Sequence, residues 1–128
     1  MGIFLKDINL KGKTALITGA TKGIGRGAAI AIAEAGGNVI AIGRNQIELN
    51  TLRKEIKKFK VNYVPFSCDV NDYNRIKSFI TNLKNLDILV NNAGTNIPEP
   101  FLNVKKSSME TLLNVNTKAV FNLSLIHI

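Results

Sequence analysis

A glycine-rich segment between an apolar run and a helical stretch is the feature that most constrains this chain. Residues 18–25 read Thr-Gly-Ala-Thr-Lys-Gly-Ile-Gly, and they follow the apolar run 14–17. A strand, a glycine turn and a helix N-terminus in that order suit a pyrophosphate, because backbone N–H groups and the helix dipole point at the anion. The alternative is a strand-to-helix connection in which glycine adopts positive φ and no ligand binds. The candidate ligand-binding residues of this segment are Gly19, Thr21, Lys22, Gly23, Ile24 and Gly25.

Two further motifs follow the glycine turn. Asn91-Asn92-Ala93-Gly94 comes after the apolar run 86–90, and Leu113-Asn114-Val115-Asn116 lies further along the chain. The glycine spacing also differs from G-x-G-x-x-G and has the form T-G-x-x-x-G-x-G. Together the three motifs, in this order and over nearly the whole chain, resemble the short-chain dehydrogenase/reductase family.

Apolar runs and helical stripes alternate along the chain, which predicts an α/β fold with a parallel sheet and helices on both of its faces. Short, nearly continuous apolar runs suit strands that are buried on both faces. We expect strands at residues 14–18, 38–43, 61–66 and 87–91. We expect helices at about 23–35, 49–60, from 73 onward and at about 107–123. The resemblance implies the doubly wound Rossmann fold.

The length of 128 residues suits one domain. A complete member of the family is about twice as long, because the doubly wound sheet has two mononucleotide-binding halves. We therefore expect residues 1–122 to form about the first half of a Rossmann domain. Residues 123–128 match the translation of a common sequencing adaptor, so we expect a non-native tail there and give His127 no functional weight.

Targeting signals are not evident in the sequence. Residues 1–7 lack the basic lead and apolar core of a secretion signal, and Lys6 stands where myristoylation at Gly2 would need Ser or Thr. No run approaches the roughly 18 apolar residues that span a bilayer. Since Cys68 is the single cysteine, we expect no internal disulfide and a cytoplasmic protein. We also expect no membrane partner and no metal site.

The chain carries a formal net charge of +8. Much of the excess falls in residues 53–60, on the polar face of the helix expected at 49–60, whose apolar stripe is Leu49, Leu52, Ile56 and Phe59. We expect no nucleic-acid partner, because no aromatic residues interleave with the charges as stacking platforms. A basic interaction protein is an alternative that this helix alone supports.

The end of the second expected strand bears on the choice of cofactor. An acidic residue there binds both ribose hydroxyls and repels a 2′-phosphate, whereas arginine favours the phosphate. This chain has Gly43-Arg44-Asn45 at that place, and Lys22 adds a second cation. We therefore expect NADP(H) rather than NAD(H), with Arg44 and Lys22 flanking the 2′-phosphate. The alternative is that both are solvated surface cations.

Further cofactor contacts follow from the resemblance. It implies that Asp69, with Val70 beside it, binds the adenine end, although a turn or a helix cap is the structural alternative for an aspartate there. It also implies that Asn91, Ala93 and Gly94 line the adenosine ribose. We expect Asn92 to brace the sheet and Cys68 to be a small buried side chain rather than a reactive thiol.

Asn116 is the one candidate catalytic residue. It shares a helix face with Met109, Leu112, Leu113 and Val120, and a buried amide must be hydrogen-bonded. The resemblance implies that this Asn holds a water of the proton relay; a structural Asn is the alternative. The family's other catalytic residues, a Ser followed by Tyr-x-x-x-Lys, are absent, and we interpret Tyr73-Asn74-Arg75-Ile76-Lys77 as a chance match.

The resemblance implies hydride transfer that reduces a carbonyl or oxidises an alcohol. The substrate would be a small molecule or an acyl-carrier-bound group, as in 3-oxoacyl-(acyl-carrier-protein) reductases; a gluconate-type sugar-acid dehydrogenase is an alternative. The parent protein is expected to be a homotetramer. A module that binds the nucleotide without chemistry is a further alternative, and we expect this chain alone to be inactive.

Overall fold

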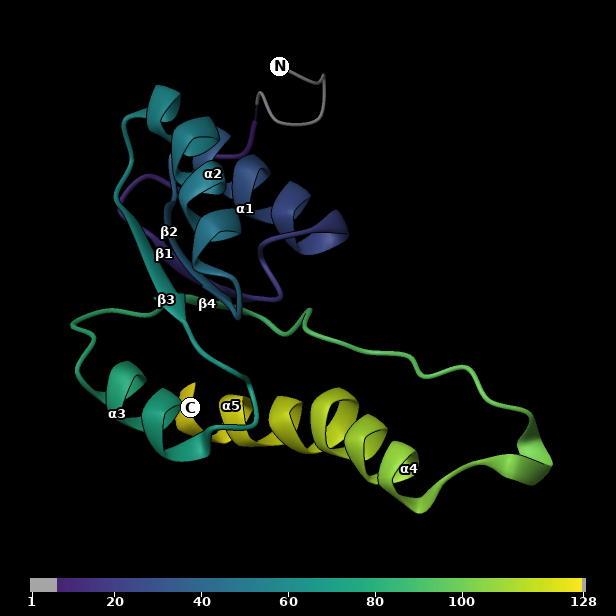
Figure 1. Ribbon diagram of the computed structural model, residues 1–128. Helices are drawn as coiled ribbons and strands as arrows, with labels where there is room; N and C mark the ends of the chain where they lie inside the picture. The colour runs from purple at the N-terminus through teal and green to yellow at the C-terminus, as the bar shows by residue number, and fades with distance from the viewer. Residues whose placement is uncertain (1–6, 128) are drawn as a thin grey trace.

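The computed structural model describes residues 7–127, so the expectations for residues 1–6 and Ile128 lie outside the described part. The chain forms the expected α/β fold, a parallel sheet of four strands with helices on both faces (Figure 1). The strands are β1 (Thr14–Thr18), β2 (Asn38–Gly43), β3 (Tyr63–Ser67) and β4 (Ile88–Val90). The helices are α1 (Gly23–Glu34), α2 (Gln46–Ile56), α3 (Tyr73–Thr81), α4 (Lys106–Leu113) and α5 (Ala119–His127).

The sheet has the order β3-β2-β1-β4, and all neighbouring strands are parallel. Side chains along a strand alternate between the two faces. Ala15 and Ile17 therefore pack with α1 and α2, whereas Leu16 packs with α3 and α5. All three are fully buried, which explains why the strand reads as a continuous apolar run.

Helix α2 differs from the expected helix at both ends. It begins at Gln46 rather than at residue 49, because the Asn45 side chain accepts hydrogen bonds from the first turn and caps it. Its α-helical part ends at Ile56 and continues as the 3-10 turn Lys57–Phe59. Lys60 then takes a left-handed conformation with φ of 57°, which stops the helix.

The helix expected at residues 107–123 is longer and is interrupted. Helix α4 starts at Lys106, a π-helical turn occupies Asn114–Lys118, and α5 runs on to His127. Leu123 of α5 is buried against the face that carries α3. The foreign origin of residues 123–128 stays a prediction.

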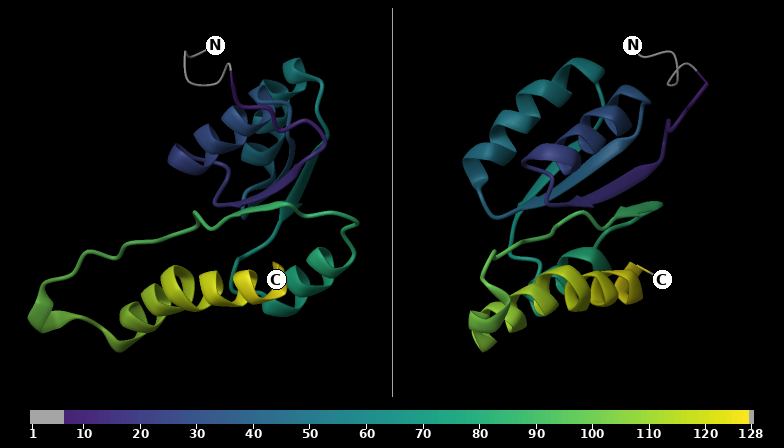
Figure 2. Two further views of the ribbon diagram at one scale, coloured as in Figure 1. Left: turned by 180° about the vertical axis from the view of Figure 1, so that it is seen from behind. Right: turned by 90° about the vertical axis from the view of Figure 1, so that its right-hand side faces the viewer.

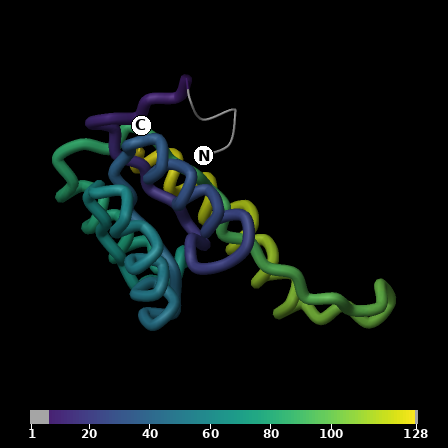
Figure 3. Tube along the Cα trace, turned by 90° about the horizontal axis from the view of Figure 1, so that it is seen from above, coloured from purple at the N-terminus to yellow at the C-terminus, as the bar shows by residue number. Residues whose placement is uncertain are grey.

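The segment between β4 and α4 extends away from the sheet. In Figures 1 and 2 the loop after β4 and helix α4 together project as an arm, and the view from above in Figure 3 shows the same projection. Large side chains on the arm are exposed, Phe101 by 91% and Leu102 by 92%. Among the helices of residues 7–127, none is long and apolar enough to cross a membrane.

Candidate functional site

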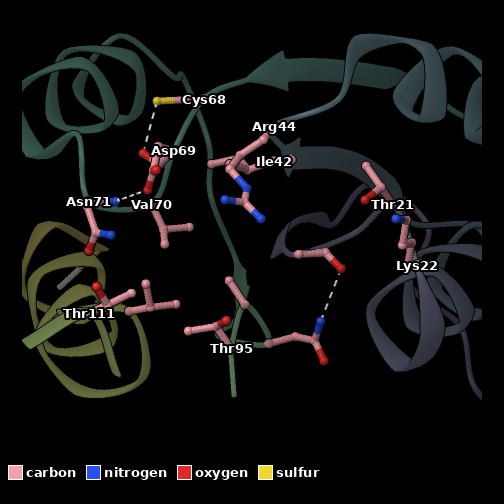
Figure 4. A pocket seen from close by; sticks show the side chains of 16 residues that line it. Thr21, Lys22, Ile42, Arg44, Cys68, Asp69, Val70, Asn71, Thr95 and Thr111 are labelled. Atoms are coloured by element: carbon pink, nitrogen blue, oxygen red, sulfur yellow. Dashed lines mark hydrogen bonds between the residues drawn. The ribbon is translucent and has the colours of Figure 1, made fainter. Parts of the chain in front are cut away.

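A cavity of about 390 Å³ lies at the carboxyl ends of the strands, where open α/β sheets bind their ligands (Figure 4). Its volume is within the range of about 300–1,000 Å³ that is usual for small-molecule sites. The glycine turn forms one wall, the segments after β2 and β3 form the next, and the segment after β4 closes it. The arrangement brings eight of the predicted site residues together: Gly19, Thr21, Lys22, Arg44, Asp69, Val70, Ala93 and Gly94.

The glycine turn is fastened to the segment after β4 by polar contacts. The Thr18 hydroxyl accepts hydrogen bonds from the backbone N–H of Asn92 at 3.1 Å and of Ala93 at 2.9 Å. The side-chain amide of Asn92 donates to the carbonyls of Thr18 and Gly19 at 3.2 and 3.1 Å. These bonds confirm that Asn92 braces the sheet, and they hold two walls of the cavity at a fixed separation.

This contact explains two of the glycines. A Cβ at Gly25 would lie 2.3 Å from the Asn92 amide nitrogen and 2.3 Å from the Gly19 carbonyl oxygen. A Cβ at Gly19 would lie 2.9 Å from the Ala93 Cα, and Gly19 has a φ of +62°. Because a side chain fits at neither position, the motif is required for packing the turn as well as for any ligand.

The first turn of α1 is left open at the end of this glycine turn. Its N-cap residue, Lys22, is extended and makes no side-chain hydrogen bond to the helix. The first N–H groups of a helix have no partner within the helix itself, so an uncapped first turn presents donors to an anion. At α2, by contrast, Asn45 accepts from the N–H groups of Ile47 and Glu48.

Two cations line the cavity on the side of α1 and α2. Figure 4 shows the Arg44 side chain extending into the cavity, with Lys22 on the wall formed by the glycine turn. Lys22 Nζ lies 3.1 Å from Glu48 Oε1, and this lysine lowers the pKa of the Glu48 carboxyl. Within residues 7–127, Arg44 forms no ion pair.

The opposite wall contains Asp69 and its neighbours. The Asp69 Oδ1 accepts a hydrogen bond from the Asn71 N–H at 2.9 Å, which is the turn geometry that the structural alternative predicted. Cys68 is buried as expected, and burial raises the pKa of its thiol. Asp69 still lines the cavity, so its turn contact and the expected adenine contact are compatible.

Asn116 lies in the π-helical turn and faces the loop after β4. Its Oδ1 accepts from the Thr95 N–H at 2.8 Å, and its Nδ2 donates to the Thr95 carbonyl at 2.9 Å. The expected apolar, buried surrounding is wrong: Asn116 is exposed, and so are Met109 and Leu113, because α4 projects beyond the sheet. The expected hydrogen bonding of the amide is confirmed, whereas the role in a proton relay stays a prediction.

Several predicted residues do not line the cavity. Asn91 instead donates to the Ser124 hydroxyl at 3.1 Å. Tyr73 and Lys77 lie on α3, outside the cavity, in agreement with a chance match to Tyr-x-x-x-Lys. The predicted residues that are absent from the lining are Gly23, Ile24, Gly25, Asn91 and Asn116.

Other lining residues were not predicted as ligand contacts. Thr111 and Val115 reach the cavity from α4 and the π-helical turn, four residues apart on one helical face, and that spacing was the signal that could have found them. The unpredicted lining residues at the ends of the strands could have been found from the rule that ligands bind at the carboxyl ends of parallel strands. The unpredicted lining residues are Ile42, Gly43, Cys68, Asn71, Asn92, Thr95, Thr111 and Val115.

In the described part of the chain, no three His, Cys, Asp or Glu side chains cluster as metal ligands.

Comparison with known proteins identifies the family. The family model described as short chain dehydrogenase matches residues 13–127. The chain therefore belongs to the short-chain dehydrogenase/reductase family, and its relatives in that family are oxidoreductases.

The relatives are about twice as long as this chain. L-xylulose reductase of Mus musculus is 38% identical over 118 residues, which are 92% of this chain and 47% of the relative. The 3-oxoacyl-(acyl-carrier-protein) reductase of Thermotoga maritima is 33% identical over 121 residues, 91% of this chain and 49% of the relative. L-sorbose reductase of Gluconobacter frateurii, solved with NADPH and L-sorbose, has a TM-score of 0.87 and 26% identity over 94% of this chain and 48% of its own. The chain thus spans about half the length of the proteins that it matches.

Proposed function

We propose that this chain is the coenzyme-binding part of an NADP(H)-dependent oxidoreductase. The observation that carries the proposal is the cavity at the strand ends, which is lined by the cations Lys22 and Arg44 and lies beside the uncapped first turn of α1. Its cations and the open first turn beside it suit the phosphates of a dinucleotide. When bound, NADP(H) would supply or accept the hydride that interconverts a carbonyl and an alcohol.

The chain's own residues would bind and orient the coenzyme. The open N–H groups of α1 would face the diphosphate, and Lys22 and Arg44 would face the 2′-phosphate. Asp69 and Val70 would border the adenine, and Ala93 and Gly94 the ribose. Asn116, through its bonds to Thr95, would hold the loop that passes this site.

The preference for NADP(H) rests on the two cations. The carveol dehydrogenase of Mycobacterium avium, with a TM-score of 0.83 and 25% identity, was solved with NAD, so the fold accepts either coenzyme. Isothermal titration of this chain with NADPH and NADH tests the preference. We expect NADPH to bind about tenfold more tightly, because two cations each contribute up to about 1 kcal/mol; tighter binding of NADH would overturn the proposal.

A matched pair of variants locates the preference. Arg44→Gln removes a cation that lines the cavity, and Lys54→Gln removes an exposed cation from α2 outside it. We expect the first to reduce the NADPH preference about threefold and the second to leave it unchanged. Equal effects would show that overall charge, rather than the site, selects the coenzyme.

Two substrate classes are supported by relatives. A 3-oxoacyl group on a carrier protein is the first, from the Thermotoga relative. A sugar or sugar acid is the second, supported by the higher identity to L-xylulose reductase and by 34% identity over 125 residues to the 2-dehydro-3-deoxy-D-gluconate 5-dehydrogenase of Pseudoalteromonas atlantica. NADPH oxidation by a full-length protein with a 3-oxoacyl thioester and with L-xylulose distinguishes them.

This chain alone is proposed to bind the coenzyme without turnover, because Tyr73 and Lys77 lie outside the cavity. Detectable NADPH oxidation by the 128-residue chain with either substrate would overturn that proposal. The homotetrameric parent and the cytoplasmic location remain proposals too. The mass of the parent protein in solution tests the tetramer, and fractionation of the cells that make it tests the location.

A further inference from the structure

A second, open hollow adjoins the cavity on the side of α2. It shares Thr21, Lys22 and Arg44 with the cavity and continues over the first turn of α2. Of the described residues that line it, Glu48 is the only acidic one. The cations that would receive a phosphate therefore share their surroundings with one carboxylate.

The backbone of Glu48 lies in the capped first turn of α2. Its N–H donates to Asn45 Oδ1 at 3.2 Å in the capped first turn of α2. Its side chain is 27% exposed, whereas that of Lys22 is 79% exposed. The carboxylate is thus the more buried partner of the 3.1 Å ion pair, and the lysine is the partner that a ligand can reach from solvent.

Arg26 fixes α2 relative to the glycine turn. Its guanidinium donates to the Thr21 carbonyl at 3.0 Å and to the Thr51 hydroxyl at 3.3 Å, and it pairs with the Glu55 carboxylate. These contacts join the glycine turn to successive turns of α2. The Lys22–Glu48 pair is therefore part of a braced junction between α1 and α2.

We infer that Glu48 competes with the 2′-phosphate of the coenzyme for Lys22 and so restrains the preference for NADP(H). A cation that is already paired contributes less to a new anion, because the first pair must be broken or shared. The carboxylate also repels a phosphate that approaches Lys22. The inference rests on the proposed function, since it concerns the same coenzyme site.

The test is calorimetric titration of the chain and of Glu48→Gln with NADPH and with NADH. Glutamine keeps the length and the hydrogen-bonding capacity of the side chain but removes its charge. We expect the NADPH affinity to rise about two- to fivefold and the NADH affinity to change less than about twofold. An unchanged or weaker NADPH affinity would overturn the inference, since it would show that Glu48 is neutral or positions Lys22 for binding.

Two further variants test whether the rise in NADPH affinity expected for Glu48→Gln arises at Lys22. Glu34→Gln removes a carboxylate at the far end of α1, outside both hollows, and should leave the ratio of affinities unchanged. In a Lys22→Gln background, Glu48→Gln should give at most half of its original gain, because no lysine remains to be released. A full gain in that background would overturn competition for Lys22.

The design separates this inference from the proposed function. The ratio of the two affinities in wild type tests the NADP(H) preference, and the change in that ratio in Glu48→Gln tests the role of Glu48. If wild type binds NADPH and NADH equally and Glu48→Gln prefers NADPH, the proposed NADP(H) preference is overturned and the inferred role of Glu48 is supported. The ratio is measured in one sample and does not depend on the folded fraction, so partial unfolding of a variant does not obscure it.

Discussion

Helices α1 and α2 begin at the same edge of the sheet, but their first turns are completed differently. In α2 the Asn45 side chain accepts from two N–H groups of the first turn, at 2.9 and 3.2 Å. In α1 the corresponding residue is Lys22, which makes no such bond. One helix thus satisfies its own first turn, whereas the other leaves donors open beside a cavity.

The first turn of α1 has less stabilisation of its own than the first turn of α2. A side-chain cap stabilises a helix by about 1 kcal/mol, and α1 forgoes it. Glycine at positions 23 and 25 lowers the helix propensity of the same turn further. Helix α1 lacks the stabilisation that α2 obtains from its cap, and it packs against the sheet through Ala29 and Ala33.

The largest expected effect comes from filling the contact between the α1 turn and Asn92. Gly25→Ala places a Cβ 2.3 Å from two fixed atoms, so we expect a loss of about 2–3 kcal/mol in the free energy of unfolding and loss of NADPH binding. Gly27→Ala is the matched control, since nothing lies within 4 Å of its Cβ, and it should gain about 0.5–1 kcal/mol. Urea denaturation measures both. Equal stability of the two variants would refute the packing argument.

Thr18 is the next test, because its hydroxyl accepts from two backbone N–H groups of the segment after β4. Thr18→Val leaves both donors without that acceptor and should cost about 2 kcal/mol. Thr14→Val, at the other end of β1, should change the stability by less than about 0.5 kcal/mol. A small effect at Thr18 would mean that the glycine turn is not held by this contact.

Loss of the Asn45 cap of α2 should have a smaller effect on stability. Asn45→Ala should cost about 1 kcal/mol of stability in urea denaturation, because two N–H groups of α2 lose their acceptor. NADPH affinity should stay within about twofold, since the donors at α1 are unaffected. A large loss of affinity would show that the first turn of α2, and not that of α1, carries the binding.

The contact between β3 and α2 gives an expected effect no larger than that of the cap, and this effect shrinks at high pH. The Tyr63 hydroxyl donates to the Leu49 carbonyl at 2.7 Å, and burial raises the pKa of Tyr63 to about 12. The unfolded state therefore releases this proton first, so the stability that Tyr63 contributes is constant below about pH 10 and falls as the pH rises toward 12.

Chemical unfolding of wild type and Tyr63→Phe at pH 9 and pH 11 checks this. Wild type should be the more stable by about 1 kcal/mol at the lower pH, because of the hydrogen bond, and its advantage should shrink at the higher pH. Tyr73→Phe, at an exposed position of α3, is the control and should show no such trend. A constant advantage across both pH values would contradict the shift.

The sequence predicted the strands near the glycine turn better than the end of the chain. The ranges expected for β1 and β2 agree with the structure, because buried parallel strands are continuous apolar runs. The start of α2 was missed because Asn45 was considered for its place beside Arg44 and not as a cap. The π-helical turn was missed because apolar periodicity does not report a local change of hydrogen-bonding pattern.

The candidate site was predicted where motifs and strand ends coincide. Gly19, Lys22, Arg44 and Asp69 follow from that coincidence and line the cavity. Glu48 could not be found in the same way, since its role depends on how α2 lies against the glycine turn. Asn116 was predicted to lie in an apolar surrounding because the spacing of apolar residues does not show that α4 projects beyond the sheet.

The most direct measurement compares the backbone amides of α1 and α2 while NADPH is added. In two-dimensional ¹H–¹⁵N NMR spectra, the amide signals of Gly23, Ile24 and Gly25 should shift strongly as the coenzyme binds. The amides of Ile47 and Glu48, which already donate to the Asn45 side chain, should shift much less. Larger shifts at α2 than at α1, or saturation without any change at Gly23–Gly25, would contradict the claim that the open turn of α1 holds the diphosphate.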